Sequence, residues 1–362
     1  MEDQLNLLRM NYKNLILYKA GLPDFPRNFS RDSIISAILM QDSNMLKDQL
    51  IFCAKKQGKK NDAYSGEEPG KIFHEYPGFE MRGLSTLYNA CDTTALFLIG
   101  HEIYQKLTKD KTLFKKQKKN IINAINYIKN HLENYRFIED PKFCGNSKFA
   151  LKVTYWKDSD IINRKNNEPV YPITYSLAHI QNMRAMKSAY FLLNNKEYLK
   201  TYENMKKYFQ EKLFDNKTNE MFLAIDSKGS IKATNSDSLH ASFYLDKEDL
   251  TISQISRIKE QSKKLETIYG FRTLSEEDSQ FTNNSYHSKT IWPFEQAIIN
   301  IGAKKFNLKE IQNISHRITN YLKTNPEFLK IENNGVVYGG CDPQLWTIAS
   351  KKYFENPKGI FP

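Results

Sequence analysis

The chain has 362 residues, of which 40% are hydrophobic, and this is enough apolar material for a sizeable core rather than a disordered chain. A chain of this length contains either two ordinary domains or one large closed architecture. No apolar stretch reaches the roughly 20 residues that a membrane span requires, and the first residues lack the basic and then apolar pattern of a signal peptide. We therefore expect a cytoplasmic globular protein without a membrane partner.

The cysteines and the net charge of +12 exclude further classes of protein. Cys53, Cys91, Cys144 and Cys341 lie far apart and form no Cys-x-x-Cys pair, so neither a zinc knuckle nor a disulfide framework is indicated. The lysines are spread over many segments, which favours solvated helix faces over a nucleic-acid surface. The seven histidines lack the spacing of a metal site and no glycine-rich nucleotide motif occurs, so no metal, cofactor or nucleic acid is predicted.

Helical periodicity dominates the chain and gives two kinds of segment. Amphipathic, lysine-rich helices, which need one face in water, are predicted at 2–19, 44–57, 113–134, 196–214, 249–266 and 307–324. Segments that are apolar nearly all round, as in helices buried on both sides, are predicted at 33–40, 93–100, 174–193, 239–245, 295–302 and 345–350.

The two kinds of helix largely alternate along the chain, although the first two pairs are hard to assign by this test. An outer ring of amphipathic helices around an inner ring of buried ones explains the alternation. We therefore predict an all-α fold, an (α/α)6 toroid that forms one domain over residues 1–362. A helical solenoid is the alternative, and it is disfavoured because no repeat of fixed period occurs.

The segments that lead into the predicted buried helices are mostly long and rich in aromatic, charged, Pro and Gly residues. They cover 23–32, 61–92, 155–172, 235–240, 286–293 and 325–343. In a toroid, loops at the same end of the inner ring converge on one cavity. We therefore expect a functional cavity at one rim, with long loops around it.

Cleavage of a glycosidic bond needs one carboxylic acid that protonates the leaving oxygen and a second carboxylate that activates water or attacks carbon. Asp158, which follows the aromatic Tyr155 and Trp156, is the predicted general acid, with Asp160 as a rival for that role. Glu327, in the approach to the last buried helix, is the predicted general base. Taken singly, Asp158 also suits a turn cap and Glu327 an ordinary surface position.

Other polar and aromatic residues of the same segments suit a sugar, whose hydroxyl pairs match charged groups and whose ring face stacks on aromatic rings. The predicted substrate-binding residues are Arg31, Asp32, Lys71, His74, Glu75, Asp92, Trp156, Gln181, His287, Trp292 and Glu295. Trp346, the third tryptophan, lies just past a rim loop. Two alternatives remain open: Arg31 and Asp32 can pair with each other at a helix start, and Trp292 and Trp346 can belong to the core.

Six motifs follow one another along the chain: Phe29-Ser-Arg-Asp-Ser-Ile-Ile-Ser-Ala, Glu68-Pro-Gly-Lys-Ile-Phe-His-Glu, Cys91-Asp-Thr-Thr-Ala-Leu-Phe, Trp156-Lys-Asp-Ser, Tyr286-His-Ser-Lys-Thr-Ile-Trp-Pro and Cys341-Asp-Pro-Gln-Leu-Trp. In sequence and order they resemble the amylo-α-1,6-glucosidase catalytic domain of glycogen-debranching-type glycoside hydrolases. The resemblance spans most of the chain and implies an (α/α)6, six-hairpin glycosidase-like fold. It places the acid at Asp158 and the base at Glu327. It also implies a pocket for the terminal glucose, formed by Arg31, Asp32, Lys71, His74, Glu75 and Asp92.

The sequence departs from the family pattern at two places. The base lies in Asn-Pro-Glu-Phe where the family typically shows Leu-Pro-Glu-Leu, and Phe-Glu follows Trp292-Pro293 where the family usually has another polar pattern. The chain also begins almost at the first predicted helix, without the N-terminal β-rich domain or the transferase domain that family members often carry, so action on large branched glycogen is not implied.

The sequence as a whole predicts an inverting glycoside hydrolase that removes a terminal α-linked glucosyl residue, and the resemblance implies an amylo-α-1,6-glucosidase-like activity that debranches glycogen or another α-glucan. Two alternatives remain: a hydrolase of small oligosaccharides or disaccharides, like an α-glucosidase or trehalase, and a catalytically inactive carbohydrate-binding protein. The expected partner is a carbohydrate, and the oligomeric state is left open.

Overall fold

The computed structural model describes residues 2–158, 169–279, 281, 285–333 and 335–357. Twelve α-helices run through these residues. They are α1 (Glu2–Leu8), α2 (Ser30–Met40), α3 (Ser43–Lys55), α4 (Thr93–Thr108), α5 (Thr112–Asn130), α6 (Ser176–Leu193), α7 (Lys196–Lys212), α8 (Asp237–Ala241), α9 (Ile252–Leu265), α10 (Pro293–Lys305), α11 (Lys309–His316) and α12 (Leu345–Glu355).

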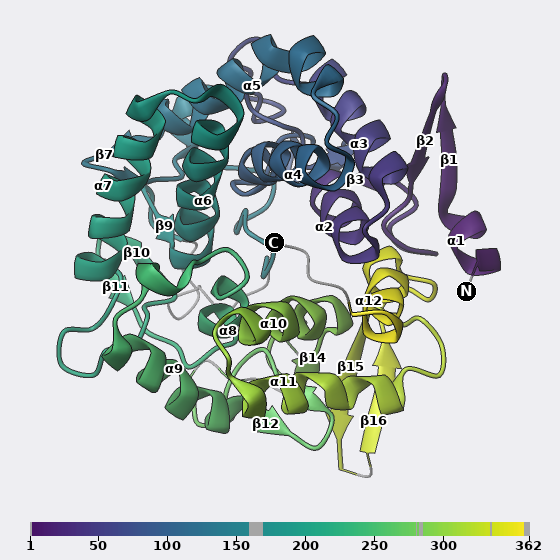
Figure 1. Ribbon diagram of the computed structural model, residues 1–362, viewed down its shortest axis with the longest axis vertical. Coiled ribbons are helices and arrows are strands. Elements are labelled where there is room, and N and C mark those ends of the chain that lie inside the picture. The colour runs from purple at the N-terminus through teal and green to yellow at the C-terminus, as the bar shows by residue number, and fades with distance from the viewer. Residues whose placement is uncertain (1, 159–168, 280, 282–284, 334, 358–362) are drawn as a thin grey trace.

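The even-numbered helices form an inner set. Helix α2 contacts α4, α4 contacts α6, and the series continues through α8 and α10 to α12, which packs against α2 (Figure 1). Burial explains their all-round apolar sequences, because the residues of α2 from Ser30 to Leu39 and those of α10 from Pro293 to Ala303 are all buried. Each of the six segments predicted to be apolar all round contains or overlaps one of these helices.

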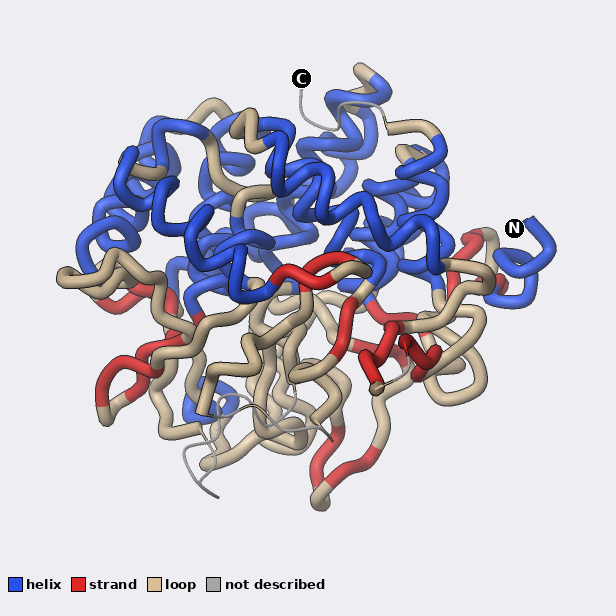
Figure 2. The backbone as a smooth tube through the Cα atoms, turned by 90° about the horizontal axis from the view of Figure 1, so that it is seen from below, coloured by secondary structure: helices blue, strands red, loops and turns tan. Residues whose placement is uncertain are grey.

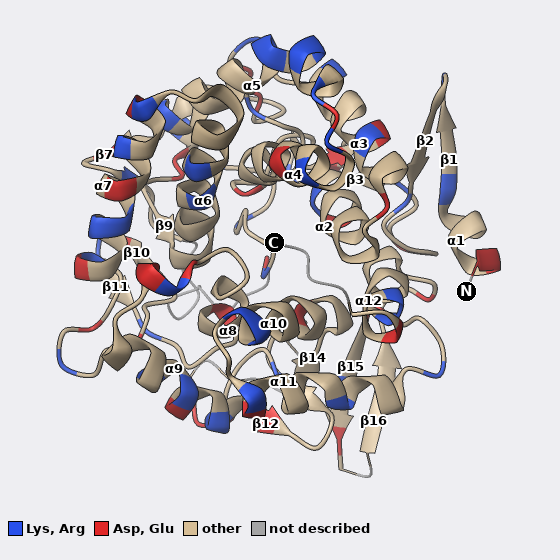
Figure 3. Cartoon of the chain, viewed as in Figure 1, with Lys and Arg blue, Asp and Glu red and all other residues tan. Residues whose placement is uncertain are grey.

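Most odd-numbered helices lie outside this set, where each packs against inner helices: α3 against α2 and α4, α5 against α4 and α6, α7 against α6, α9 against α8, and α11 against α10. Helix α5 shows why. Leu113, Ile121, Ala124, Ile125 and Ile128 are buried and recur at helical spacing, whereas the lysines between them are mostly exposed. Figure 3 shows Lys and Arg concentrated on outer helices such as α5 and α7.

The prediction of one helix over 2–19 was wrong. Helix α1 ends at Leu8, and an antiparallel hairpin of β1 (Arg9–Tyr12) and β2 (Leu15–Tyr18) follows it. Lys13 turns the chain with a φ of 55°. Leu15 and Leu17 then alternate with less buried residues, and β2 packs against α3, so the burial period is two rather than 3.6. The predicted helix 307–324 is also shorter, because α11 ends at His316 and a 3-10 helix, Arg317–Tyr321, follows.

Strands and long loops gather at one end of the helices, as Figure 2 shows. Two strand pairs there join distant loops. Strand β3 (Asn28–Phe29) pairs with β4 (Glu75–Tyr76), and β14 (Thr290–Ile291) pairs with β15 (Phe328–Glu332), which also pairs with β16 (Gly335–Gly339). These pairings bring the approach to α2 beside the 71–75 segment, and the approach to α10 beside the loop that contains Glu327.

The other strands are short: β5 (Glu80–Met81), β6 (Leu84–Ser85), β7 (Leu132–Glu133), β8 (Arg136–Phe137), β9 (Thr174–Tyr175), β10 (Ala224–Asp226), β11 (Gly229–Ile231), β12 (Glu266–Thr267) and β13 (Gly270–Phe271). Among the described residues, no helix combines the length and apolar character needed to cross a bilayer.

Candidate active site

A pocket lies where the rim loops meet the first turns of α2, α10 and α12. It is lined by Ala20, Phe25, Phe29, Arg31, Asp32, His74, Trp156, Asp158, Tyr286, His287, Trp292, Glu327, Gln344 and Trp346. Its volume is about 100 Å³. Eight of these residues, including both predicted catalytic carboxyls, belong to the site predicted from the sequence, and the fold therefore brings together segments as distant as Arg31 and Glu327.

Arg31, which lines the pocket, is held by an ion pair with the residue that precedes α4. Its Nε and Nη2 atoms donate to Asp92 Oδ2 and Oδ1 at 2.8 and 2.9 Å. Although burial opposes its charge, the Asp92 carboxylate raises the pKa of Arg31. Arg31 therefore pairs with Asp92 rather than simply with its neighbour Asp32, and it supplies a permanent positive charge to a pocket that contains three carboxyls.

Asp32, in the first turn of α2, is the most perturbed of the three pocket carboxyls. Burial raises its pKa to about 8, Arg31 lowers it, and the nearby carboxyls of Glu327 and Asp158 raise it further. Because like charges in one pocket disfavour ionisation, Asp32 is held as a neutral acid through most of the range in which an unperturbed Asp is charged. A neutral carboxyl can both donate and accept a hydrogen bond with a hydroxyl group.

We expect Asp32→Asn to stabilise the fold increasingly as the pH rises from 4 to 8. The pKa of Asp32 is higher in the folded than in the unfolded state, so ionisation of Asp32 favours unfolding. This loss of stability begins above about pH 4 and is complete as the pH rises through about 8, and an Asn at this position avoids it. The gain at pH 8 should be on the order of a few kcal/mol. Thermal unfolding at pH 4, 6 and 8 measures it, with Asp3→Asn on the exposed start of α1 as control. A gain that does not change with pH would contradict this reading of Asp32.

Asp158 lies in the loop after Trp156, and its side chain is exposed. The surrounding protein atoms nevertheless displace part of the water around its carboxyl group, and this desolvation raises the pKa of Asp158 to about 6. The Arg31 charge lowers this pKa, whereas the Asp92 and Glu75 carboxyls raise it. An acid with this pKa is partly protonated near neutral pH, as a proton donor must be. Its rival Asp160 lies outside the described residues.

The residue before Asp158 anchors the loop. Lys157 is fully buried, and its Nζ atom donates to Asp237 Oδ1 and to Ser236 Oγ, both at 2.7 Å. Tyr155 donates from its hydroxyl to the other Asp237 oxygen at 3.2 Å. Ser236 in turn donates to Glu295 Oε1 at 2.6 Å. The backbone that carries Asp158 is thereby tied to the start of α8 and to α10.

Glu327 lines the same pocket, in the loop that leads into β15, and is 3% exposed. Tyr286 donates its hydroxyl proton to Glu327 Oε1, and the backbone N–H of Cys341 donates to Oε2 at 3.1 Å. Burial raises the pKa of Glu327 to about 7, the two hydrogen bonds lower it, and Asp158 raises it. A carboxylate with this pKa can accept a proton near neutral pH.

Gly340 makes room for Glu327. It has a φ of +70°, and a Cβ atom on it would lie 2.1 Å from Glu327 Oε2. Both the left-handed backbone and the close approach require glycine here. The Glu327 carboxylate therefore packs directly on the backbone of the loop before α12.

Aromatic rings and unsatisfied polar atoms complete the pocket. His287 stacks on Trp292 with ring centroids 5.0 Å apart, and Trp156 and Trp346 meet Trp292 edge-on at 5.8 and 5.5 Å. Within the described part of the chain, five lining residues bury a polar side-chain atom that has no hydrogen-bond partner. These atoms are His74 Nδ1, Trp156 Nε1, His287 Nδ1, Gln344 Oε1 and Trp346 Nε1.

Such atoms are costly in a folded protein unless a ligand or water satisfies them. Burial, with help from Arg31, lowers the pKa values of His74 and His287 well below the ordinary histidine value, so both rings are neutral and can donate or accept. The pocket thus offers aromatic faces, neutral hydrogen-bonding groups and carboxyls, a combination that suits a sugar ring. Over the described ranges, His, Cys, Asp and Glu side chains do not gather in threes as a metal ion would need.

Five of the predicted binding residues lie behind the pocket wall. Lys71 pairs with Glu68 and Glu139, Glu75 with Arg27, and Asp92 with Arg31, while Gln181 donates to the Tyr244 hydroxyl and Glu295 accepts from Ser236. They contact other protein groups and are not among the residues that line the cavity. Conversely, the sequence did not single out Phe25, Phe29, Tyr286 or Gln344 as binding residues, although the last three lie inside the quoted motifs.

The sequence matches no family model and no curated protein. Its fold, however, matches solved structures. A GH63 mannosylglycerate hydrolase from Thermus thermophilus, in complex with Tris and D-glycerate, superposes with a TM-score of 0.74 over 98% of both chains at 10% sequence identity. The same hydrolase in complex with glucose gives 0.71, also over 98% of both chains at 10% identity. An uncharacterized conserved protein from that organism gives 0.72 over 94% of this chain and 96% of the other, again at 10% identity. The chain therefore shares its predominantly helical fold with these proteins.

Proposed function

We propose that the protein is an inverting glycoside hydrolase, with Asp158 as general acid and Glu327 as general base, and that its helix pairs form an (α/α)6 toroid. One observation carries the proposal: two carboxyls with pKa values raised to about 6 and about 7 line the same pocket, together with buried polar atoms that have no hydrogen-bond partner in the described part of the protein. Perturbed carboxyls in a cleft are typical of acid and base catalysts.

In the proposed reaction a terminal sugar occupies the pocket. The Asp158 carboxyl protonates the glycosidic oxygen as the bond from that oxygen to the anomeric carbon breaks. Glu327 takes a proton from a water molecule that attacks the anomeric carbon from the opposite face. The product then has inverted configuration, and this route requires the two carboxyls to be roughly 6.5–9.5 Å apart, against roughly 5–5.5 Å in a retaining enzyme.

The proposed sugar-binding groups are the predicted residues that line the pocket. Asp32 and the neutral rings of His74 and His287 would exchange hydrogen bonds with hydroxyl groups, and Trp156 and Trp292 would contact the sugar ring. Lys71, Glu75, Asp92, Gln181 and Glu295 would support these groups from behind. Because the enclosed space is small, we propose that one terminal residue enters, and the motif resemblance favours an α-linked glucosyl residue.

A second candidate substrate is a small glycoside. The structural neighbour acts on mannosylglycerate and has been solved with glucose and with D-glycerate, and a cavity of about 100 Å³ suits a small ligand. Hydrolysis of glycosyl-glycerates is therefore tested beside that of α-glucans.

A glycan panel tests both candidates. Isomaltose, maltose, trehalose, limit dextrin and mannosyl- and glucosylglycerate are incubated with the full chain, and NMR follows the anomer released first. An inverting enzyme releases the β-anomer first from an α-linked substrate. Trehalose is the exception, because inversion at one anomeric carbon yields one β- and one α-glucose. From the other substrates, early release of the α-anomer of the glycosyl residue would reject Glu327 as a base, and binding without hydrolysis of any α-glycoside would identify a carbohydrate-binding protein instead.

Tyr286→Phe should move the pH optimum of hydrolysis upward. The Tyr286 hydroxyl stabilises the charged form of Glu327, so its removal raises the pKa of Glu327. For one acid and one base, the optimum of kcat/KM lies midway between their pKa values, at about 6.5 for pKa values of about 6 and about 7. The optimum should rise by half the increase in the Glu327 pKa, whichever group titrates first.

Profiles of kcat/KM from about pH 4.5 to about pH 9 measure this shift. Tyr338→Phe, which removes another hydroxyl from the same end of the chain, is a control because Tyr338 donates to the Tyr321 carbonyl. An unchanged optimum in Tyr286→Phe, with a lower rate at every pH, would show that Tyr286 does not act through Glu327.

A further inference from the structure

A second cavity lies on the outside of the molecule, between the end of α3, the 57–70 loop and α5. It is lined by Ala54, Lys55, Gln57, Gly58, Lys59, Pro69, Gly70, Lys119, Asn120, Asn123, Asn126 and Asn130. Its volume is about 700 Å³, compared with about 100 Å³ for the catalytic pocket, and the two share no lining residue. We call this cavity the Lys-Asn groove.

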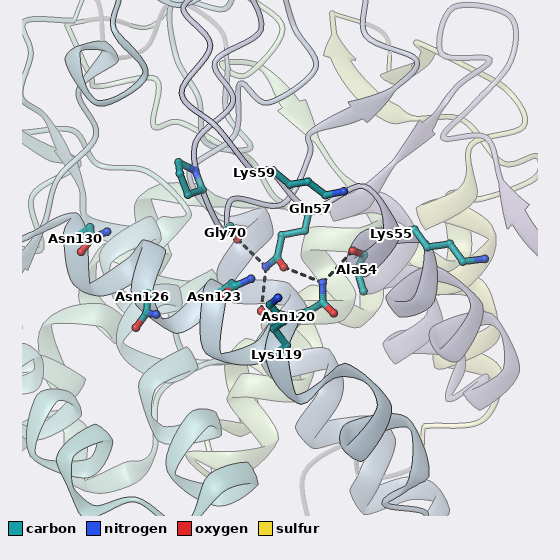
Figure 4. A pocket seen from close by; sticks show the side chains of 12 residues that line it. Ala54, Lys55, Gln57, Lys59, Gly70, Lys119, Asn120, Asn123, Asn126 and Asn130 are labelled. Carbon is teal, nitrogen blue, oxygen red and sulfur yellow. Dashed lines mark hydrogen bonds between the residues drawn. The ribbon is translucent and has the colours of Figure 1, made fainter.

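The floor of the Lys-Asn groove is rigid. Gln57 is 5% exposed and donates to the carbonyl oxygens of Gly70 and Asn120 at 2.9 and 3.0 Å. Asn120 returns hydrogen bonds to the Gln57 side chain at 2.9 Å and to the Ala54 carbonyl at 3.0 Å, as the dashed lines in Figure 4 show. Gly70 has a φ of +90°, and a Cβ atom there would lie 2.2 Å from the Asn123 carbonyl oxygen. The loop therefore packs directly on α5.

The wall of the groove is polar and open to solvent. Within the described ranges, the side-chain amides of Asn123, Asn126 and Asn130 make no hydrogen bond to protein, and Lys55, Lys59 and Lys119 form no ion pair; Asn123 is half-buried and the other five are exposed. No carboxylate and no aromatic ring is among the described lining residues. The nearby Glu67 carboxylate accepts from the backbone N–H of Lys59 and is not part of the wall. The residues that line the groove therefore carry a net positive charge.

The asparagine amides extend to one end of the groove. In Figure 4 Asn126 and Asn130 lie on one side of the Gln57–Asn120 pair and Lys55 on the other, with Lys59 above the pair and Lys119 below it. Along α5 the stretch from Lys119 to Asn130 spans about 16 Å, at about 1.5 Å per residue. Lysine ammonium groups bind phosphate or carboxylate oxygens, whereas an asparagine amide both donates to and accepts from hydroxyl groups. Without aromatic rings the groove cannot stack a sugar ring or a base.

We propose that the Lys-Asn groove is a binding site for a phosphorylated sugar, with the phosphate at Lys55, Lys59 and Lys119 and the hydroxyl groups at Asn123, Asn126 and Asn130. The net charge of +12 adds long-range attraction for such an anion. The loop that forms one wall continues into the segment that places His74 in the catalytic pocket, so the bound sugar phosphate contacts the same loop as the active site. The site does not depend on the proposed hydrolase activity.

Calorimetric titration of the full chain at about 150 mM salt tests the proposal, with glucose 6-phosphate, glucose 1-phosphate, inorganic phosphate and glucose as probes. A sugar phosphate should bind at least about tenfold more tightly than inorganic phosphate, because only the sugar reaches the asparagines. The triple variant K55Q/K59Q/K119Q should weaken binding of the sugar phosphate by at least about tenfold. Asn126→Ala should weaken binding of the sugar phosphate but leave that of inorganic phosphate unchanged.

The matched control is K115Q/K116Q/K118Q, which removes the same charge from exposed lysines of the same helix outside the groove. It should change each affinity less than about twofold. If both triple variants lose the same affinity for the sugar phosphate, the effect comes from net charge alone, and the proposed site is rejected. No binding of any sugar phosphate, or binding no tighter than that of inorganic phosphate, would also overturn it. Glucose binding that survives in K55Q/K59Q/K119Q belongs to the catalytic pocket.

Discussion

Replacement of Asp158 by Asn is expected to lower kcat by about 10³-fold on a glycoside with a poor leaving group, within the range that loss of a general acid produces. The same variant should lose far less on a glycosyl fluoride, whose fluoride departs without protonation. The exposed position of Asp158 predicts that stability is retained, so thermal unfolding of the variant should match that of the wild type.

Glu327→Gln gives the complementary result. A general base is needed whatever the leaving group, so we expect a loss of about 10³-fold on both the glycoside and the glycosyl fluoride. The amide preserves the shape of the side chain and can still accept from Tyr286 or from the Cys341 N–H. The leaving-group dependence thus separates the roles of the two carboxyls, and equal losses on both substrates in Asp158→Asn would reject the assignment of the acid.

The inner helices could be predicted because burial on all sides leaves a signal in the sequence itself. Runs such as 33–40 have hardly a polar face, and α2 indeed lies within the core. The apolar pattern did not include the first turn of that helix, because Ser30, Arg31 and Asp32 are polar and yet buried at the pocket. The hairpin over 9–18 could not be predicted in the same way, since Leu15 and Leu17 are buried by α3, a contact that periodicity does not report.

The pocket was predictable only in part, for a similar reason. Polar residues in a rim segment indicate a site, but the sequence does not say whether a side chain faces the cavity or a partner behind it. Lys71 illustrates the difference, because its charge is matched by Glu68 and Glu139, which are 3 and 68 positions away in the chain. Gln344 shows the converse: an ordinary residue becomes part of the site because α12 closes against α2.

Lys157→Met should lower both stability and kcat. The buried ammonium group balances Asp237 and contacts the face of Trp156, with Nζ 5.0 Å from the ring centroid. Removing one partner of a buried ion pair typically costs about 3–5 kcal/mol. The melting temperature should therefore fall by several degrees, whereas Lys148→Met, at an exposed position in the same region, should leave it unchanged.

A structural role of Lys157 can be separated from a positioning role. In the double variant K157M/D237N the Asp237 carboxylate is also removed, whereas that of Glu295, whose Oε1 lies 3.8 Å from Lys157 Nζ, remains, so part of the lost stability should return. The loop that carries Asp158 would still lack its anchor, because the hydrogen bonds from Nζ to Ser236 and Asp237 are gone. If Lys157 positions the acid, kcat of the double variant stays low on glycosides with poor leaving groups and is close to that of the wild type on the glycosyl fluoride. Equal losses on the two substrates would instead mean that Lys157 acts on the whole pocket, through Trp156 and the packing around it, and not through Asp158.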